Sequence, residues 1–250
     1  MDYCLNDSIL VYEILEKTNT LDLTIQRSLL TGMPLDRVNA SIASLDSLYL
    51  KEARKRNLVC PTSQYSSSKE RITGGYVMES KPGIYDYITV LDFKSLYPSI
   101  MRTFNIDPAS HIAKKEEDCI TAPNGAMFRN EEGILPKIIQ EMALHREQAR
   151  KDKNELARYA IKIHLNSMFG VLANPTCRFY SLDMANAITH FGQELIKLTA
   201  KKIEERGYEV IYSDSITKDR YVTLLVDGIL TIKNIEELFL DYKDQIKTRL

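Results

Sequence analysis

The sequence predicts an α+β fold, in which long amphipathic helices combine with short strands of an antiparallel sheet. Three long helical patterns cover residues 135–151, 154–170 and 182–206. Two runs rich in β-branched and aromatic residues, YDYITVL and YEVIYS, are typical of strands. An aspartate follows each run, Asp92 after the first and Asp214 after the second, so the candidate chemistry lies at strand ends.

The composition is that of a globular protein without a strong overall charge. Of the 250 residues, 44% are hydrophobic and 27% are charged, which is ordinary for a soluble protein of one large or two modest domains. The 33 Lys and Arg residues nearly balance the 34 Asp and Glu residues. A nucleic acid partner would therefore have to be held by a local cluster of cations.

Cysteine spacing and hydropathy favour a cytoplasmic protein without a membrane partner. Cys4, Cys60, Cys119 and Cys177 lie far apart and form no CxxC pair, which favours reduced thiols over a zinc site or a disulfide framework. No apolar run is long enough to span a bilayer, and the N-terminus lacks a secretory pattern.

The first 58 residues are predicted to be helical. SILVYEILEK and VNASIASLDSLYLKEARKRN carry apolar residues at helical spacing, and TGMPLD between them is predicted to be a loop. The polar, serine-rich stretch at 60–73 predicts a linker.

Strands and helices alternate after this linker. The run at 85–93 is predicted to be a buried strand, and SLYPSIMRTF a short helix. The Asn124-Gly125 pair within 115–133 predicts a hairpin, and Gly207 is the predicted C-cap of the helix at 182–206. In the final 36 residues, TLLV and ILTI flank Asp227-Gly228 as in a compact hairpin, and IEELFLDYKDQIKTRL has the pattern of a short amphipathic helix.

Asp92, in LDFKSLYPSI, is the first candidate for chemistry. A carboxylate at a strand end, directly before a turn into a helix, presents an oxygen ligand beside the amides of the helix's first turn. This arrangement suits a Mg²⁺ ion that bridges to phosphate. A plain helix cap or a solvated Asp is the alternative for such a residue taken alone.

The second candidate is a group of cations on the two helices at 135–151 and 154–170. If these helices fold back on each other about residues 152 and 153, Arg146 and Lys162 lie at similar height, and Asn166 follows Lys162 by one turn. Residues 146–162 hold six basic and three acidic side chains. Such a surface suits a polyphosphate, which Arg binds through two N–H groups and Lys as a point charge. A solvated helical hairpin is the alternative.

Taken in order, these motifs resemble those of family B DNA polymerases. LDFKSLYPSI is similar to the family's first palm motif, KIHLNSMFG to its fingers motif KxxxNSxYG, and VIYSD to the opening of its second palm motif, YGDTDS. GGYVMESKPGIYD, RTFNIDP and RGYEV are most similar to the bacterial polymerase II branch and its archaeal relatives. The resemblance covers roughly residues 3–214.

The resemblance implies a catalytic role for the first palm motif. Asp92 and the backbone carbonyl of Phe93 would hold two Mg²⁺ ions that activate the primer 3′-hydroxyl and stabilise the leaving pyrophosphate. The amides of Ser95, Leu96 and Tyr97 would bind the triphosphate, and the Tyr97 ring would exclude a ribose 2′-hydroxyl. The implied partners are primer–template DNA and deoxynucleoside triphosphates.

The resemblance also implies roles for the fingers motif. Arg146 and Lys162 would bind the incoming phosphates, and Asn166 and Phe169 would lie near the nascent base pair. The family usually has Tyr at the position of Phe169, so any contact through that hydroxyl is lost here.

Tyr3 and Asp7, in YCLND, match the last proofreading motif of the family, YxxxD. The two earlier carboxylate motifs of that exonuclease would lie upstream of Met1. One acid of four cannot form the exonuclease metal site, so we expect no proofreading activity.

The second palm motif departs from the family after Asp214. In YGDTDS the second Asp completes the metal site, and Asp214 fills only the first position. Asp219 stands five residues after Asp214 instead of two, which favours the opposite side of an extended chain and makes it a poor substitute.

SITKDRYVTLLVDGILTIKNIEELF resembles the opening of an intein, a self-splicing insert that related archaeal polymerases carry at this position. The resemblance implies that the Ser215 hydroxyl attacks the Asp214 carbonyl and converts the amide to an ester. The implied partner is a C-terminal polymerase and intein fragment whose polymerase part begins Thr-Asp-Ser. A truncated or frameshifted polymerase is the alternative.

The resemblance implies a partial polymerase palm, a two-helix fingers hairpin, a helical N-terminal segment and a small C-terminal tail rich in β-hairpins. The expected segments are the end of an exonuclease domain with connecting helices (1–59), a linker (60–73), the first part of the palm (74–134), the fingers hairpin (135–170), the second part of the palm (171–214) and an N-terminal intein fragment (215–250).

We therefore expect a fragment of a template-directed DNA polymerase that is latent until it is joined or spliced to a C-terminal part. Two alternatives stay open at this point. One is a non-catalytic paralogue that binds nucleotide or DNA, and the other is an autonomous carrier of an intein.

Overall fold

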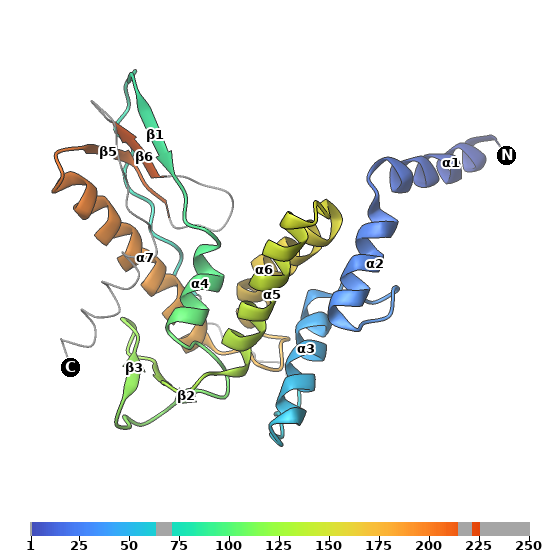
Figure 1. The fold of residues 1–250 in the computed structure, drawn as a ribbon, viewed down its shortest axis with the longest axis horizontal. Helices are drawn as coiled ribbons and strands as arrows, with labels where there is room; N and C mark the ends of the chain where they lie inside the picture. The colour runs from blue at the N-terminus through green and yellow to red at the C-terminus, as the bar shows by residue number, and fades with distance from the viewer. Residues whose placement is uncertain (1, 64–71, 215–221, 226–250) are drawn as a thin grey trace. The chain divides into compact units, whose positions relative to one another are not determined.

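The computed structural model describes residues 2–63, 72–214 and 222–225 of the chain (Figure 1). Its contacts divide the chain into two compact units, each built from three stretches that are far apart in sequence. Unit 1 is Met1–Ser68, Asp107–Ala109 and Glu131–Ser181, and unit 2 is Lys69–Ile106, Ser110–Asn130 and Leu182–Leu250.

The described part of unit 1 is helical. Its elements are α1 (Asp2–Lys17), α2 (Thr20–Thr31), α3 (Ser41–Lys55), α5 (Ile134–Lys151) and α6 (Glu155–Leu172). The α6 helix packs against α5 and also contacts α2 and α3. Ile161, Leu165 and Met168 are buried at helical spacing, so a continuous apolar stripe of α6 faces its neighbours. The helices predicted within the first 58 residues and within 135–170 are confirmed.

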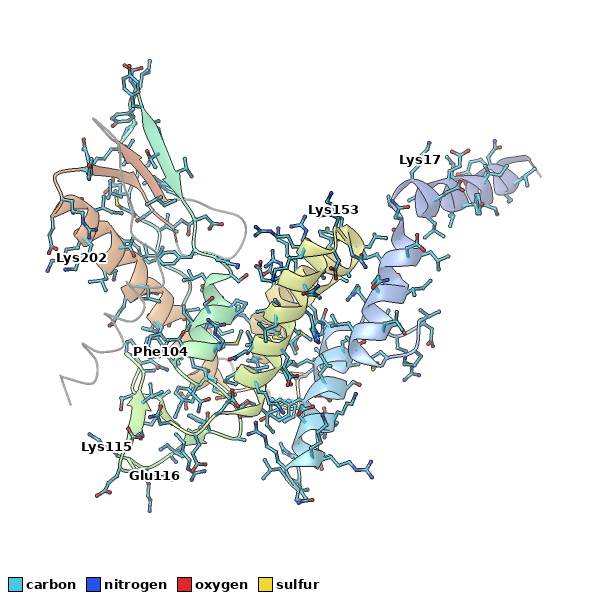
Figure 2. The ribbon with its side chains drawn as sticks, in the orientation of Figure 1. Lys17, Phe104, Lys115, Glu116, Lys153 and Lys202 are labelled. Carbon is cyan, nitrogen blue, oxygen red and sulfur yellow. The ribbon has the colours of Figure 1, made fainter. Side chains whose placement is uncertain are left out.

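A tight bend joins α5 to α6. Lys153 adopts a left-handed conformation with φ of 55°, and its backbone lies at the tip of the hairpin (Figure 2). The Asn154 side chain then accepts a hydrogen bond from the Ala157 amide at 3.0 Å, which caps the first turn of α6. The predicted reversal about residues 152 and 153 is confirmed.

A buried carboxylate joins three stretches of unit 1. Asp107 is fully buried and accepts hydrogen bonds from the Tyr49 hydroxyl at 3.1 Å and from the backbone amides of Ala109 at 2.8 Å and Leu135 at 2.7 Å. Leu135 lies in the first turn of α5, so Asp107 satisfies one of the amides that this helix cannot pair internally. Burial raises the pKa of Asp107, which these donors oppose.

Unit 2 contains a three-stranded sheet in the order β1–β6–β5, formed by Ile88–Leu91, Val222–Leu225 and Glu209–Tyr212. Both outer strands pair antiparallel with β6, so β1 and β5 run parallel to each other. Two helices, α4 (Leu96–Thr103) and α7 (Leu182–Glu204), contact each other, and α7 also contacts β5. Phe93, Ile196, Ile203 and Val210 form the core between α7 and the sheet.

A smaller sheet in unit 2 has the order β2–β4–β3, formed by His111–Ile112, Met127–Arg129 and Cys119–Thr121. The predicted hairpin is confirmed: β3 and β4 pair antiparallel around Asn124 and Gly125, and Gly125 has φ of 87°. Gly207 has φ of 85° and donates its amide to the Glu204 carbonyl at 2.9 Å, so it ends α7 as predicted.

The prediction that the strand at 85–93 is buried is wrong. The strand itself is present as β1, but Ile88 and Val90 keep 46% and 48% of their surface exposed. Alternate side chains of a strand point to opposite faces, and only the face of Leu91 packs against the core of unit 2. Of the predicted TLLV and ILTI pair, Val222–Leu225 is β6, whereas 229–232 and the helix predicted after them lie outside the described residues.

None of the helices in the described parts of the chain combines the length and the apolarity that crossing a bilayer demands. α7, with 23 residues, ends in a turn that carries Lys201 and Lys202. It contacts α4 and β5.

Replacement of Asp107 by Ala should destabilise the chain by about 3 kcal/mol, because three buried donors lose their acceptor at once. Urea unfolding followed by far-ultraviolet circular dichroism measures this difference. Asp36→Ala, which removes an exposed carboxylate of unit 1, is the matched control and should leave the unfolding midpoint unchanged. Equal midpoints for the two variants would contradict the anchoring role of Asp107.

Candidate active site

Asp92 is exposed directly after β1, and the following Phe93 is buried in the core of unit 2. The chain then turns sharply into α4, because Ser95 adopts a left-handed conformation with φ of 54°. Such a conformation is unfavourable for a residue with a Cβ, so the packing on both sides must impose it. The predicted carboxylate at the junction of a strand and a helix is confirmed as local structure.

The three residues that open α4 differ in exposure. Ser95 and Leu96 are half-buried, whereas Tyr97 keeps only 4% of its surface exposed. Burial raises the pKa of Tyr97 to about 12, and the negative charge of Asp214 adds to this shift. The Tyr97 ring therefore lies close enough to Asp214 for their charges to interact, although the two residues are far apart in sequence.

Asp214 lies just beyond β5 in a closely packed stretch. It is 6% exposed and accepts a hydrogen bond from the Tyr212 hydroxyl at 3.1 Å. A second segment runs along this strand end: Val77 forms a β-bridge with Asp214, and the Met78 amide donates to the Ser213 carbonyl at 2.8 Å. The Ser213 hydroxyl is buried and has no hydrogen-bond partner among the described residues.

The sheet register brings Asp92 and Asp214 to the same end of unit 2. Leu91, at the end of β1, pairs with Val222, and Tyr212, at the end of β5, pairs with Thr223. Both strands therefore end at the beginning of β6, and they are separated by that single strand. Two strand spacings correspond to about 10 Å between the backbones, a distance across which side chains can approach each other.

The described residues supply an incomplete set of metal ligands. No group of three or more His, Cys, Asp or Glu side chains in the described part of the chain is arranged to hold a metal ion. Asp92 offers an exposed carboxylate, while Asp214 is buried and bound to Tyr212. Asp219 and Ser215, the other residues discussed for this region, lie outside the described residues.

The predicted phosphate-binding side chains lie on the α5–α6 hairpin of unit 1. Arg146 of α5 and Lys162 of α6 are half-buried, and Asn166 is exposed one turn after Lys162. Burial lowers the pKa of Arg146, and the positive charge of Arg158 lowers it further. Arg158 stands one turn before Lys162, so Arg146 faces the stretch of α6 that carries Lys162.

Two further predicted residues, Tyr3 and Asp7, lie on α1. Both are exposed, and Tyr3 keeps 78% of its surface accessible. They are four residues apart on one helix and therefore share a face. Phe169, at the end of the fingers motif, is half-buried on α6.

His164 lies within the fingers motif and was not singled out from the sequence. It is 2% exposed, and its Nε2 atom has no hydrogen-bond partner among the described residues. Burial lowers the pKa of His164 to about 4, and the positive charge of Arg27 contributes to this shift. The helical spacing of His164 with Ile161, Leu165 and Met168 could have predicted its burial, because this spacing places it on the buried face of α6.

Comparison with known proteins gives the family. The family model of DNA polymerase family B matches residues 39–226 of the chain. DNA polymerase II of Escherichia coli K12 is 36% identical over 217 residues, which cover 85% of this chain and 28% of that protein. A DNA polymerase of Thermococcus gorgonarius is 29% identical over 260 residues, which cover 96% of this chain and 33% of that protein.

A solved structure agrees with these sequence matches. The family B DNA polymerase from the hyperthermophilic archaeon Pyrobaculum calidifontis superimposes with a TM-score of 0.66 at 25% sequence identity, covering 93% of this chain and 31% of that one. The chain belongs to DNA polymerase family B. It spans about a third or less of the length of these relatives.

The low pKa of His164 should make the chain sensitive to acid. The unfolded chain binds a proton at His164 near pH 6.5 and the folded chain only near pH 4, so stability is full above pH 6.5 and falls as the pH drops toward 4. Between pH 8 and pH 5 the loss from this group should be about 2 kcal/mol.

Urea unfolding of the wild type and of His164→Leu at both pH values measures the contribution, because other acid-sensitive groups affect both proteins alike. The wild type should lose more stability than the variant over this range. An identical loss in the two proteins would show that His164 titrates normally in the folded chain.

Proposed function

We propose that this chain carries the primer-activating and nucleotide-binding parts of a template-directed DNA polymerase, which adds deoxynucleotides to a primer 3′-hydroxyl. The observation that carries the proposal is the family B match over residues 39–226, a range that contains the first palm motif, the fingers motif and the opening of the second palm motif in family order. The substrates are deoxynucleoside triphosphates and primer–template DNA, and the biological process is DNA replication.

In this proposal the beginning of α4 binds the triphosphate. Ser95 is the N-cap of α4, and the amides of Leu96 and Tyr97 lie in its first turn, where the backbone dipoles favour an anion. The Tyr97 ring meets the sugar and excludes a 2′-hydroxyl. Its low exposure supports this role, because a ring held by packing resists displacement by a larger sugar.

Asp92 and the carbonyl of Phe93 are the proposed first ligands of two Mg²⁺ ions. The exposed position of Asp92 supports this role, because a hydrated cation reaches a residue at the surface without crossing the core. The other carboxylate of the proposed metal site is the second aspartate of the palm motif, which a joined polypeptide beginning Thr-Asp-Ser would supply.

Arg146 and Lys162 are the proposed ligands of the incoming phosphates, and Asn166 lies beside them near the base pair. Both cations are half-buried, which supports the role, because a charge partly removed from water attracts an anion more strongly than a fully solvated one.

A non-catalytic paralogue that binds nucleotide or DNA is the second candidate function. The observation that favours it is the incomplete set of metal ligands in the described part of the chain. It requires the same nucleotide binding but no primer extension after any second polypeptide is added.

The interruption after Asp214 supports a further part of the proposal. Ser215 follows the interrupted motif, and we propose that it starts a splicing reaction that joins Asp214 to a polypeptide beginning Thr-Asp-Ser. The hydroxyl attacks the Asp214 carbonyl and converts the amide bond to an ester. The hydroxyl of the incoming Thr then takes the Asp214 acyl group, so the ester bond to Ser215 breaks and residues 215–250 leave with Ser215 as the free alcohol. Once the partner's intein part is cleaved from that Thr, the acyl group shifts from the Thr oxygen to its amine and forms a peptide bond. The joined product regains the second aspartate of the palm motif, and until then the chain is latent.

Removal of the Lys162 ammonium group should lower the affinity of the full chain for a deoxynucleotide about tenfold, because a charge-assisted contact to phosphate is lost. Isothermal titration of Lys162→Ala with dATP in the presence of Mg²⁺ measures this effect. Lys115→Ala, which removes an exposed lysine from unit 2, is the control and should bind as the wild type does. Equal losses of affinity for dATP in both variants would indicate non-specific attraction of the anion and would contradict the proposed site.

Splicing should be visible by mass. When the chain is mixed with a polypeptide that supplies the C-terminal intein and a polymerase part beginning Thr-Asp-Ser, residues 215–250 should be lost and a joined product should form. Ser215→Ala should block this product, because the nucleophile is gone. The joined product should extend a primer, and Asp92→Ala in that product should abolish extension. An unchanged mass would count against splicing, and extension without the Asp92 carboxylate would count against the polymerase site.

A further inference from the structure

Gly192 lies in the middle of α7, at a place where a side chain would make a tight contact with the opening of α4. A Cβ atom built on Gly192 would stand 3.2 Å from Cε1 of Tyr97, 3.9 Å from its Cδ1 and 3.6 Å from Cδ1 of Ile100. Carbon atoms in favourable contact are about 3.5–4.0 Å apart, so the first of these distances is repulsive. Glycine destabilises the interior of a helix relative to alanine. Its presence at position 192 is explained by the small space that the Tyr97 ring leaves for a Cβ atom.

The Tyr97 ring has little freedom on the other sides. Tyr97 is 4% exposed, and Ile100, one turn later on α4, is fully buried. The α4 and α7 helices contact each other, and the charge of Asp214 reaches the Tyr97 hydroxyl. The ring therefore lies against α7, with Gly192 at its edge and the charge of Asp214 near its hydroxyl.

We propose that Gly192 is a positioning residue that sets the depth of the Tyr97 ring and thereby the discrimination between deoxyribose and ribose. The inference rests on the proposed function, in which the Tyr97 ring faces the sugar of the incoming nucleotide. Gly192 contacts no substrate in this scheme. It acts only through the ring.

The direction of the effect follows from the packing. A methyl group on residue 192 pushes the ring away from α7. Ile100 and Met101 of α4 are fully buried, so the interior offers the ring no room and we expect it to move outward. In the proposed site, the outward side is where the sugar enters. Repulsion rises steeply with overlap, so a 2′-hydroxyl is affected more than a 2′-hydrogen. The substitution should therefore increase the preference for the deoxynucleotide.

The first measurement follows the ring itself and needs no nucleotide. The full chain is labelled with ¹³C-tyrosine, and the signal of Tyr97, one of 14 tyrosines, is assigned with Tyr97→Phe. In Gly192→Ala this signal should move more than the other tyrosine signals. Gly74→Ala is the matched control, because a Cβ on Gly74 meets no atom within 4 Å. A Tyr97 signal that stays in place in Gly192→Ala overturns the inference whether or not nucleotides bind.

The second measurement follows specificity. Affinities of the full chain for dATP and ATP with Mg²⁺ give the ratio of the two dissociation constants. In Gly192→Ala this ratio should rise about three- to tenfold in favour of dATP, as expected for residues in direct contact. When Gly192→Ala is added to Tyr97→Ala, the ratio should not change, because no ring remains to be displaced. A change of the same size in both backgrounds, or none in either, overturns the inference.

Two outcomes separate this inference from the proposed function. If the Tyr97 signal moves but the wild type binds neither dATP nor ATP, the proposed function fails and the specificity role fails with it. If Gly192→Ala is too unstable for binding measurements, its thermal unfolding is compared with that of the double variant that also carries Tyr97→Ala. This comparison tests whether the methyl group on residue 192 presses on the Tyr97 ring. Recovery of stability when Tyr97→Ala is added supports this tight contact, and no recovery contradicts it.

Discussion

Burial of the Phe93 ring fixes the direction of the residues around it. Phe93 packs with Ile196 and Ile203 of α7 and with Val210 of β5. Successive side chains of an extended chain point to opposite sides, so Asp92 is directed away from this core and into solvent. The exposed carboxylate of the candidate site is therefore a consequence of apolar packing behind it.

The two aspartates at the end of the sheet have different environments. Asp92 is exposed, whereas Asp214 is buried, bound to the Tyr212 hydroxyl and close to Tyr97. A solvent-exposed carboxylate can exchange water for a cation at small cost, and a buried one is better suited to hold its surroundings in place. This difference fits the proposed roles, in which Asp92 and not Asp214 is a ligand of the metal ions.

One helix of unit 1 serves stability and the proposed binding of phosphate at the same time. Residues on an α-helix advance by 100° each, so Lys162 and Asn166 share one face while His164 lies about 200° from Lys162 on the opposite face. The exposed face carries polar groups, and the opposite one buries the imidazole among apolar side chains next to α2 and α3. The orientation of the polar face therefore depends on a packed core that contains a titratable group.

Much of the local structure was determined by the sequence alone. The strand before Asp92, the bend near Lys153, the hairpin at Asn124 and the helix end at Gly207 were all predicted, because each depends on the conformational preferences of a few neighbouring residues. The family was predictable for a similar reason, since its motifs are short and occur in a fixed order.

Only the tertiary structure decided which of these elements meet. The exposure of Ile88, the buried acceptor at Asp107, the buried ring of His164 and the tight contact that Gly192 avoids all depend on side chains far away in the sequence. Helical or strand periodicity predicts the face on which a residue lies. Whether that face is buried depends on which other segments pack against it. For this reason the sequence was enough to single out Tyr97 as a candidate site residue. Its contact with Gly192 became visible only in the folded chain.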